Sequence, residues 1–508
     1  MTDRSIDTKP RRRSFLKPDF VRAMLAGHSA LGLAFAALIY IVCLSGTLSV
    51  FVHELQRWEQ PNAPLVEGFA TPEMLQQATV NAHKQAVADN AAHDLFVMGP
   101  GGVSPRLQIN YHDHETGVQG SWIGDAEGNL DRRVVAPWSE FVADLHMVLH
   151  LPRTWGLFLV GLTGVALLSS LISGLLSHPR LFKDAFHFRW GGSHRLQEAD
   201  LHNRLGVWGL PFHVVVSLSG ALLGLSTLIV GVLALAAYDG DQQKAFSVIL
   251  GPQPSADETA APVPDVAAMV RQITDRQPDA VFSSMNIGHI AKAGQIVTIN
   301  MRSPGHLPFG NPYAFDGSGK QLYDGGFETG SIGQQILGVL QPLHFGWFGG
   351  ILVKLGYGVL GLALTVVTHT GVTIWLARRR DQGRPSPGWE RVWAAVGWSQ
   401  PLAFGTTALA ALTGGGGFLV AIYLATFAAA FAVAGVARDG GATARALRLL
   451  GAVAIAAAVA RHTQVWGAQI SDPMAWYVSA AMLLCALTLA TPVLLGGRST
   501  AKPIAEQA

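Results

Sequence analysis

The 508-residue sequence contains few charged residues and almost no cysteine. Asp, Glu, Lys and Arg make up 14% of the chain, whereas about 25% is usual for a soluble domain. The two cysteines, Cys43 and Cys485, lie far apart in apolar runs, which excludes a disulfide framework and a cluster held by several thiolates. The net charge of +2 favours no nucleic-acid partner.

Long apolar runs are what the chain has instead. Hydrophobic residues account for 49% of it, and a membrane-spanning helix needs about 20 of them in sequence. We therefore predict an α-helical polytopic membrane protein with about eight spans in the lipid bilayer. The first four spans are expected within residues 24–52, 145–177, 205–237 and 343–377, and four further spans within residues 392–496.

Lysine and arginine near the ends of the spans predict the orientation of the chain. Basic residues gather in the N-terminal segment 1–23 and in the loops 178–204 and 378–391, and such residues favour the cytoplasmic side. Both termini, including the tail 497–508, are therefore expected in the cytoplasm. The N-terminal RRRSFLK also matches a twin-arginine export signal, but we interpret it as the basic flank of the first span. The long polar segments 53–144 and 238–342 then lie in the periplasm, outside a bacterial inner membrane.

The first and third spans are copies of one another at an offset of 174 residues. His28, Gly32 and Gly46 in the first span correspond to His202, Gly206 and Gly220 in the third. The outer segments also agree, because WIGDAEGNL from Trp122 resembles YAFDGSGKQL from Tyr313, and each is typical of a strand, a turn and a second strand. The sequence predicts a duplicated helix–periplasmic α+β domain–helix unit, packed as parallel repeats, with four additional C-terminal helices.

Histidines at equivalent positions of this repeat are candidate metal ligands. His28 and His202 fall at the inner ends of their spans, whereas His146 and His344 fall at the outer ends of theirs. Polar side chains are costly in a membrane and are usually functional there. One pair at each face predicts two haem groups with histidine as the axial ligands, and glycines would leave room for the flat ring. No C-x-x-C-H motif is present, so the haem would be b-type.

Two alternatives remain open for these histidines. His213 and His369 lie deeper in the third and fourth spans and are second-choice ligands for the inner haem. Zinc is another interpretation, since His146 and His150 have the i,i+4 spacing of a helical metal site, although zinc prefers tetrahedral clusters of several ligands.

Four stretches resemble the PepSY-associated transmembrane family over about residues 20–380. They are LHMVLHLPRTWGLFLVGLTG from Leu145, LLSSLISGLL from Leu167, DLHNRLGVWGLPF from Asp200 and LHFGWFGGILVKLGYGVLGLALTVVTHTGVTIW from Leu343. The resemblance implies periplasmic PepSY-like domains and similarity to di-haem siderophore reductases of inner membranes. The motif histidines that would hold haem are His28, His146, His202 and His344. The C-terminal spans depart from the shorter reductases, and we interpret them as a packing or docking module.

These observations lead to a functional expectation. The chain would be a haem-dependent enzyme that reduces a ferric siderophore or another ferric chelate in the periplasm for iron acquisition. Its electrons would come from a quinol, an NAD(P)H-linked protein or a flavin carrier. The alternatives are a transporter of iron or siderophore, and a non-enzymatic protein whose PepSY-like domains bind peptide or regulate a protease. The candidate substrate contacts are aromatic: Trp122, Trp138, Tyr313, Trp347 and Phe348.

Overall fold

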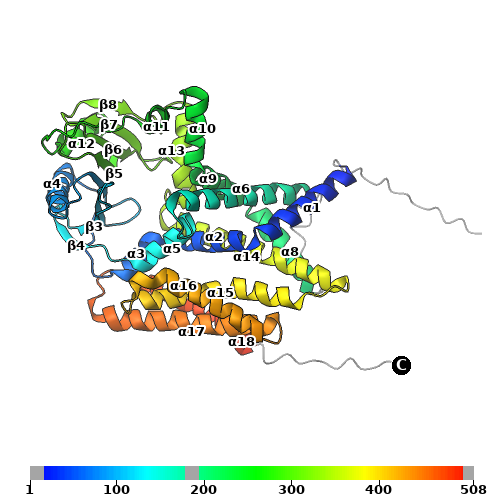
Figure 1. Cartoon of the computed structure of the whole chain (residues 1–508). Helices are drawn as coiled ribbons and strands as arrows, with labels where there is room; N and C mark the ends of the chain where they lie inside the picture. Colours follow the sequence, from blue (N-terminus) through cyan, green and yellow to red (C-terminus); the bar gives the residue numbers. More distant parts are fainter. Residues whose placement is uncertain (1–16, 178–193, 496–508) are drawn as a thin grey trace, which may run out of the picture.

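The computed structural model describes residues 17–177 and 194–495. Long helices run side by side away from a β-sheet domain at one end (Figure 1). The predicted basic N-terminus up to residue 16, residues 178–193 of the predicted cytoplasmic loop and the predicted tail 497–508 lie outside the described residues.

The chain forms two successive units of similar order, followed by a helical C-terminal module. The first unit contains α1 (Pro18–Ala34), α2 (Ala36–Ser49), α3 (Val52–Glu59), α4 (Pro72–Ala88), β1 (Asp94–Met98), β2 (Leu107–His112), β3 (Gln119–Gly124), β4 (Leu130–Arg133), α5 (Pro137–Met147) and α6 (Arg153–Ser177). The second contains α8 (His194–Trp208), α9 (Leu210–Gly224), α10 (Ser226–Ala237), α11 (Gln242–Leu250), α12 (Val266–Thr274), β5 (Val281–Gly288), β6 (Ile296–Arg302), β7 (Asn311–Asp316), β8 (Gln321–Asp324), α13 (Ile332–Phe345) and α14 (Gly350–Asp381). The module contains α15 (Pro387–Ala411), α16 (Leu419–Val436), α17 (Gly440–Trp466), α18 (Met474–Leu495) and two short 3-10 turns.

The first and third predicted spans are bent rather than continuous. The α1–α2 pair and the α8–α9 pair are each bent by 69°, at Phe35 and Gly209, which occupy equivalent positions of the repeat. Pro211 at the start of α9 suits a new helix because it has no N–H to donate to a preceding turn. Within the third predicted span, α10 is a separate apolar helix that hydropathy alone joins to α9.

The described residues contain fewer clear spans than the eight predicted. By length and composition, five helices could cross a membrane, or up to seven if each bent pair is one span. They are α6, α14, α16, α17 and α18, with α1–α2 and α8–α9 as the bent pairs. The helix α15 has 25 residues but is not among them, so the count of eight is not confirmed. The chain is nevertheless plainly built as a polytopic membrane protein.

The two predicted α+β segments form one sheet and not two separate domains. Its eight strands follow the order β4-β3-β2-β1-β5-β6-β7-β8, and the units join where β1 pairs antiparallel with β5, with Leu95 opposite Ile287. The helices α4 and α12 contribute to a single apolar core with strands of both units. A sequence repeat indicates that two segments fold alike, but not whether their sheets join edge to edge. Pairing of β1 with β5 covers two strand edges that would otherwise be exposed.

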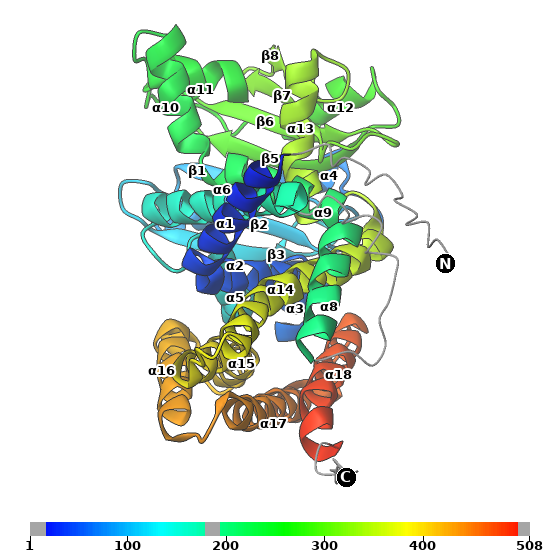
Figure 2. The same cartoon turned by 90° about the vertical axis from the view of Figure 1, so that its right-hand side faces the viewer.

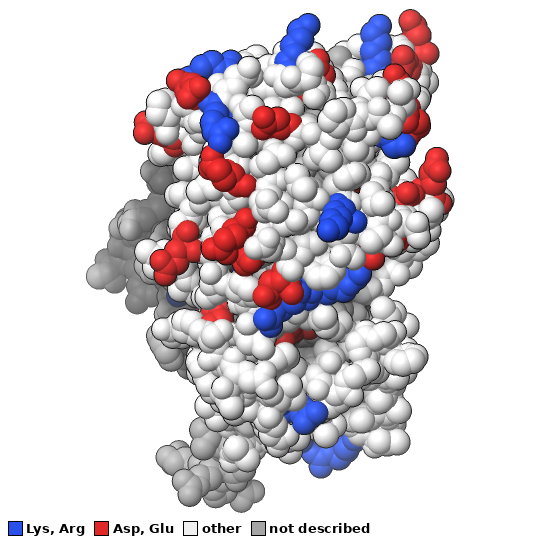
Figure 3. Space-filling view, turned by 90° about the vertical axis from the view of Figure 1, so that its left-hand side faces the viewer, with Lys and Arg blue, Asp and Glu red and all other residues white. Residues whose placement is uncertain are grey.

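Local sequence signals explain the elements of this sheet domain. The side chains of Thr71 and Asp265 accept hydrogen bonds from the first turns of α4 and α12, as helix N-caps do. In the β3–β4 and β7–β8 turns, Asp125 and Asp316 each accept backbone N–H groups. Most charged side chains of the face in Figure 3 lie over the sheet domain, and few lie below it.

The C-terminal module packs mainly against the first unit, and in the second unit its helix α15 meets α14 (Figure 2). Leu55 and Trp58 of α3 and Phe141 of α5 share an apolar core with α15, α16, α17 and α18. In the second unit, the equivalent helices α10 and α13 expose large apolar side chains, among them Leu235 and Ile332. Figure 1 shows α10 and α13 on the side of the molecule opposite the module. The module therefore breaks the symmetry of the repeat.

A buried ion pair fastens the module to α3. Arg57 donates two hydrogen bonds of 2.6 and 2.7 Å to Asp472, which is fully buried. Removing Arg57 would leave the buried Asp472 carboxylate with Arg106, 3.7 Å away, as its cationic neighbour and with its two strongest hydrogen bonds lost. We expect Arg57→Ala to lower the free energy of unfolding by about 3 kcal/mol, measured by denaturation of the detergent-solubilised protein. Arg132→Ala is the control, because Arg132 bonds Asp131 at the surface; equal losses in the two variants would contradict this role.

Candidate cofactor site

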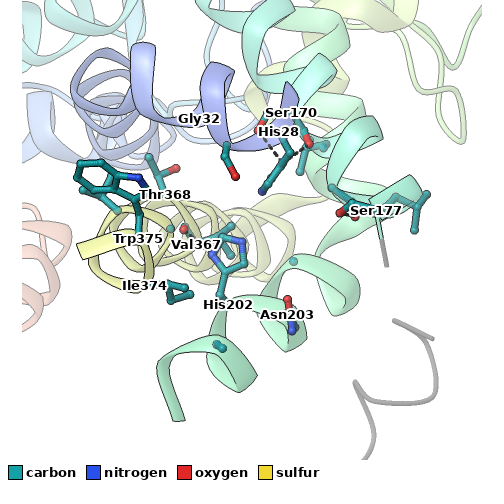
Figure 4. A pocket seen from close by; sticks show the side chains of 18 of the residues that line it. His28, Gly32, Ser170, Ser177, His202, Asn203, Val367, Thr368, Ile374 and Trp375 are labelled. Carbon is teal, nitrogen blue, oxygen red and sulfur yellow. Dashed lines mark hydrogen bonds between the residues drawn. The ribbon is translucent and has the colours of Figure 1, made fainter. Parts of the chain in front are cut away.

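Two histidines form a pair at the ends of the helices away from the sheet. His28 of α1 and His202 of α8, here called the far pair, have ring centroids 6.3 Å apart and point toward one another (Figure 4). His28 Nδ1 lies 2.9 Å from the carbonyl oxygen of Ser170 on α6. His202 Nδ1 lies 2.9 Å from the carbonyl oxygen of Val367 on α14. Each ring is thus held by the long helix of its own unit.

A second pair lies next to the sheet domain. His146 of α5 and His344 of α13, the sheet-side pair, have ring centroids 6.0 Å apart, with ring planes at 16°. His146 Nδ1 is 3.0 Å from the carbonyl oxygen of Val42 on α2. His344 is hydrogen-bonded to the backbone of Val216 on α9, the residue that the repeat places at the position of Val42. The repeat therefore conserves the anchor as well as the histidine.

For His28, His146 and His202, the carbonyl next to Nδ1 indicates which nitrogen carries the proton; Nδ1 of His344 lies 3.1 Å from Oγ of Ser219. A carbonyl oxygen only accepts, so Nδ1 must donate, and a neutral ring protonated at Nδ1 carries its lone pair at Nε2. Histidines that bind metals commonly donate their other N–H to a backbone carbonyl in this way. The arrangement suits four neutral imidazoles for ligation through Nε2.

The repeated glycines provide the space for these rings. A Cβ atom at Gly46 would lie 2.6 Å from Cε1 of His146, and one at Gly220 would lie 2.8 Å from Cε1 of His344. At the far pair, a Cβ at Gly174 would lie 3.0 Å from Cε1 of His28. Contacts under about 3 Å are too short for real atoms, so larger residues would displace the histidines.

The far pair lines a cavity of about 350 Å³ between α1, α6, α8 and α14, within the range of cofactor sites. Glycines and apolar side chains make up most of its walls, with Asn203 and Arg378 among the polar ones. A metal–imidazole bond is about 2 Å long, so two rings on opposite sides of one metal have centroids about 6 Å apart. The ring separations of both pairs fit haem with two histidine ligands, and the mostly apolar cavity at the far pair offers space for the ring.

A zinc site fits these pairs less well. Within residues 17–177 and 194–495, neither pair belongs to a group of three or more His, Cys, Asp or Glu side chains that could hold an ion. Zinc usually takes at least three protein ligands. The ring of His150, predicted as a possible partner of His146, stacks on Phe141 instead.

His213 and His369, the second-choice ligands, join neither pair among the described residues. His213 is fully buried on α9 beside Phe212. His369 of α14 faces Trp393 of the C-terminal module, with ring centroids 5.5 Å apart, and lies 5.9 Å from Tyr40 of α2. The far pair is thus formed by the first-choice residues His28 and His202.

A second cavity, the sheet-side cavity, lies between the sheet domain and the start of α14. It measures about 340 Å³ and includes Trp347 and Phe348, two of the predicted substrate contacts. Aromatic rings lead to it from the sheet-side pair, since Phe345 lies 5.5 Å from His344 and 4.5 Å from Trp347. This cavity is therefore close to one histidine pair.

The other three predicted contacts do not line this cavity. Tyr313 and Trp138 are buried in apolar cores, and the indole N–H of Trp122 donates to Tyr111 within the sheet. Sequence reasoning instead missed Arg302 at the end of β6 and His306 in the loop after it, which both line the cavity. The Pro-Gly pair inside RSPGH marked that loop, but no sequence signal related it to the distant LHFGWFGG motif.

The fold and the two histidine pairs define a duplicated polytopic membrane protein with a composite sheet domain. The profile of the PepSY-associated TM region matches residues 25–378, and the chain belongs to this family. The chain is also similar to the uncharacterized protein PA4219 of Pseudomonas aeruginosa, with 28% identity over 235 residues. That match covers 44% of this chain and 60% of the relative.

The glycine contacts predict opposite effects of one substitution at two helical positions. Alanine in place of glycine ordinarily stabilises a helix by about 1 kcal/mol. We expect Gly27→Ala to raise the thermal midpoint slightly, because nothing lies within 4 Å of its Cβ position. Gly46→Ala should lower it, because the new Cβ collides with His146. If both substitutions raised the thermal midpoint, the position of the His146 ring would not depend on Gly46.

Proposed function

We propose that the protein is an inner-membrane oxidoreductase that delivers electrons across the membrane to a ferric siderophore or another ferric chelate, with haem b at each histidine pair. The observation that carries this proposal is the repetition of one arrangement: two rings about 6 Å apart, anchored at Nδ1 by neighbouring helices. Haem bound between such rings supplies one-electron redox chemistry.

The surrounding helices support a path across the membrane. His146 shortly precedes α6, and His28 contacts Gly174 near the other end of that helix. The second unit repeats this order with His344, α14 and Gly371. The two pairs therefore belong to opposite ends of the long helices. Basic flanks of the spans favour the far pair on the cytoplasmic side and the sheet domain in the periplasm.

The sheet-side cavity is the proposed place for the ferric chelate. Arg302 and His306 offer positive charge or hydrogen bonds to an anionic chelate, while Trp347 and Phe348 offer apolar contact. Each Fe³⁺ would accept one electron there and become Fe²⁺, which hard oxygen ligands hold less tightly. The donor on the cytoplasmic side would be a quinol, an NAD(P)H-linked protein or a flavin carrier. A transporter or a peptide-binding protein would need no paired rings.

Removing one ring of the sheet-side pair should abolish haem binding at that pair and leave haem binding at the far pair intact. We expect the purified chain to contain about two haems, and His146→Ala or His344→Ala to contain about one. Reduction of external ferric citrate, followed with a chromogenic Fe²⁺ chelator in proteoliposomes with a reductant inside, should fall to background. Haem content is measured by the pyridine haemochrome spectrum.

His83→Ala is the matched control for these variants, because His83 lies on α4 in the sheet domain. It should keep both haems and full reduction. A wild-type chain without haem would overturn the proposed function. Loss of both haems from a folded His344→Ala variant would contradict two separate sites.

Removing a positive charge from the sheet-side cavity should weaken binding of the ferric chelate without changing haem binding. We expect Arg302→Ala to raise the KM for ferric citrate about tenfold, equivalent to about 1.4 kcal/mol of binding, with unchanged haem content. Arg276→Ala is the control, since Arg276 bonds Gln321 at the surface of the sheet domain. An unchanged KM in Arg302→Ala would place the chelate elsewhere.

A further inference from the structure

Histidines and carboxylates gather at the seam between the two units of the sheet, apart from both histidine pairs. His93 and Asp94 lie at the start of β1, and His289 directly follows β5. Because β1 and β5 pair antiparallel, these strand ends lie side by side. His114 joins them from the β2–β3 turn, and Glu258 from the segment before α12.

The seam contains two groups with the spacing of metal ligands. In the first, one ligand atom each from His93, Asp94 and His114 lie within 4.8 Å of one another. Asp94 already bridges the two rings, with Oδ1 3.1 Å from His93 Nδ1 and Oδ2 2.8 Å from His114 Nε2. The second group consists of His93, His289 and Glu258.

We propose that His93, Asp94 and His114 bind a divalent transition-metal ion of the zinc type. Imidazole nitrogen and carboxylate oxygen are ligands that such ions prefer. Around one tetrahedral ion the ligand atoms are about 3.5 Å apart, so small side-chain rotations close the group. The side chains of His93 and Asp94 are about three-quarters buried, whereas His114 is 65% exposed. The ion therefore has a route from solvent and a partly buried base.

The first group is favoured over the second by the neighbouring charges. Lys292 Nζ lies 3.3 Å from Glu258, so it competes for that carboxylate and repels a cation there. His289 instead supports the first group, because its backbone N–H donates to Asp94 Oδ1 and its ring lies 4.3 Å from that of His93. His289 has a φ of 53°, a conformation that is uncommon outside glycine and frequent at functional sites.

This site is separate from the proposed electron path. Val281 at the start of β5 lines the sheet-side cavity, while His289 follows the other end of that strand. Eight residues of strand span about 26 Å. Metal binding at the seam therefore does not rest on the proposed reductase function, and neither result decides the other.

Zinc binding to the full-length chain in detergent tests the proposal. The protein is stripped with a chelator, equilibrated by dialysis against buffered Zn²⁺ and measured for zinc per chain by mass spectrometry, a readout independent of haem. We expect one saturable zinc per wild-type chain. His93→Ala and His114→Ala should weaken binding at least about 100-fold, because even residues that only orient metal ligands contribute 10- to 100-fold.

Two further variants identify the ligand group. His83→Ala, elsewhere in the same domain, should bind zinc like the wild type. Glu258→Gln should retain binding within about tenfold, because Glu258 belongs only to the second group. Absence of saturable zinc in the wild type would overturn the proposal. So would tight binding in a folded His114→Ala variant, or its loss in Glu258→Gln alone.

Discussion

The contact between a histidine ring and a glycine turn of a neighbouring helix is the constraint on which the membrane part of this protein depends. Each of the four paired rings lies over a glycine of another helix and is hydrogen-bonded through Nδ1 to that same helix. The glycine lets the ring approach, and the backbone carbonyl orients it. Helices that pack this closely in a membrane gain their stability from such contacts.

Duplication explains most of the remaining architecture. Both units bend by 69° at equivalent residues, and both contribute four strands to one sheet whose centre is the β1–β5 pair. The seam of the sheet consequently collects residues from both copies, including the histidine and carboxylate group around Asp94. The C-terminal module then covers α3 and α5 but not their counterparts α10 and α13, so the duplicated scaffold has two different flanks.

Sequence reasoning was most informative where the repeat applied. The equivalence of His28 with His202, and of His146 with His344, made these four residues the first choice, because equivalent residues of a repeat lie at similar depths. Hydropathy was less informative about the course of the helices. Hydropathy joined α9 to α10 and gave no sign of the bend at Phe35. The reason is that apolar composition indicates which residues suit the lipid interior, but not the direction in which the helix axis runs. The family assignment over residues 25–378 agrees with the quoted motifs.

The sequence by itself determined that this is an apolar, duplicated chain with histidines and glycines in one repeating frame. Only the tertiary structure decided which histidines face one another. Both His202 and His369 were candidate ligands of the inner haem, but the ring of His202 meets His28, whereas the ring of His369 lies against Trp393 of the module. The tertiary structure also decided that two similar outer segments share one sheet, and that Arg302 lies beside Trp347 in one cavity. Such contacts join residues far apart in the chain, and local composition and periodicity carry no information about them.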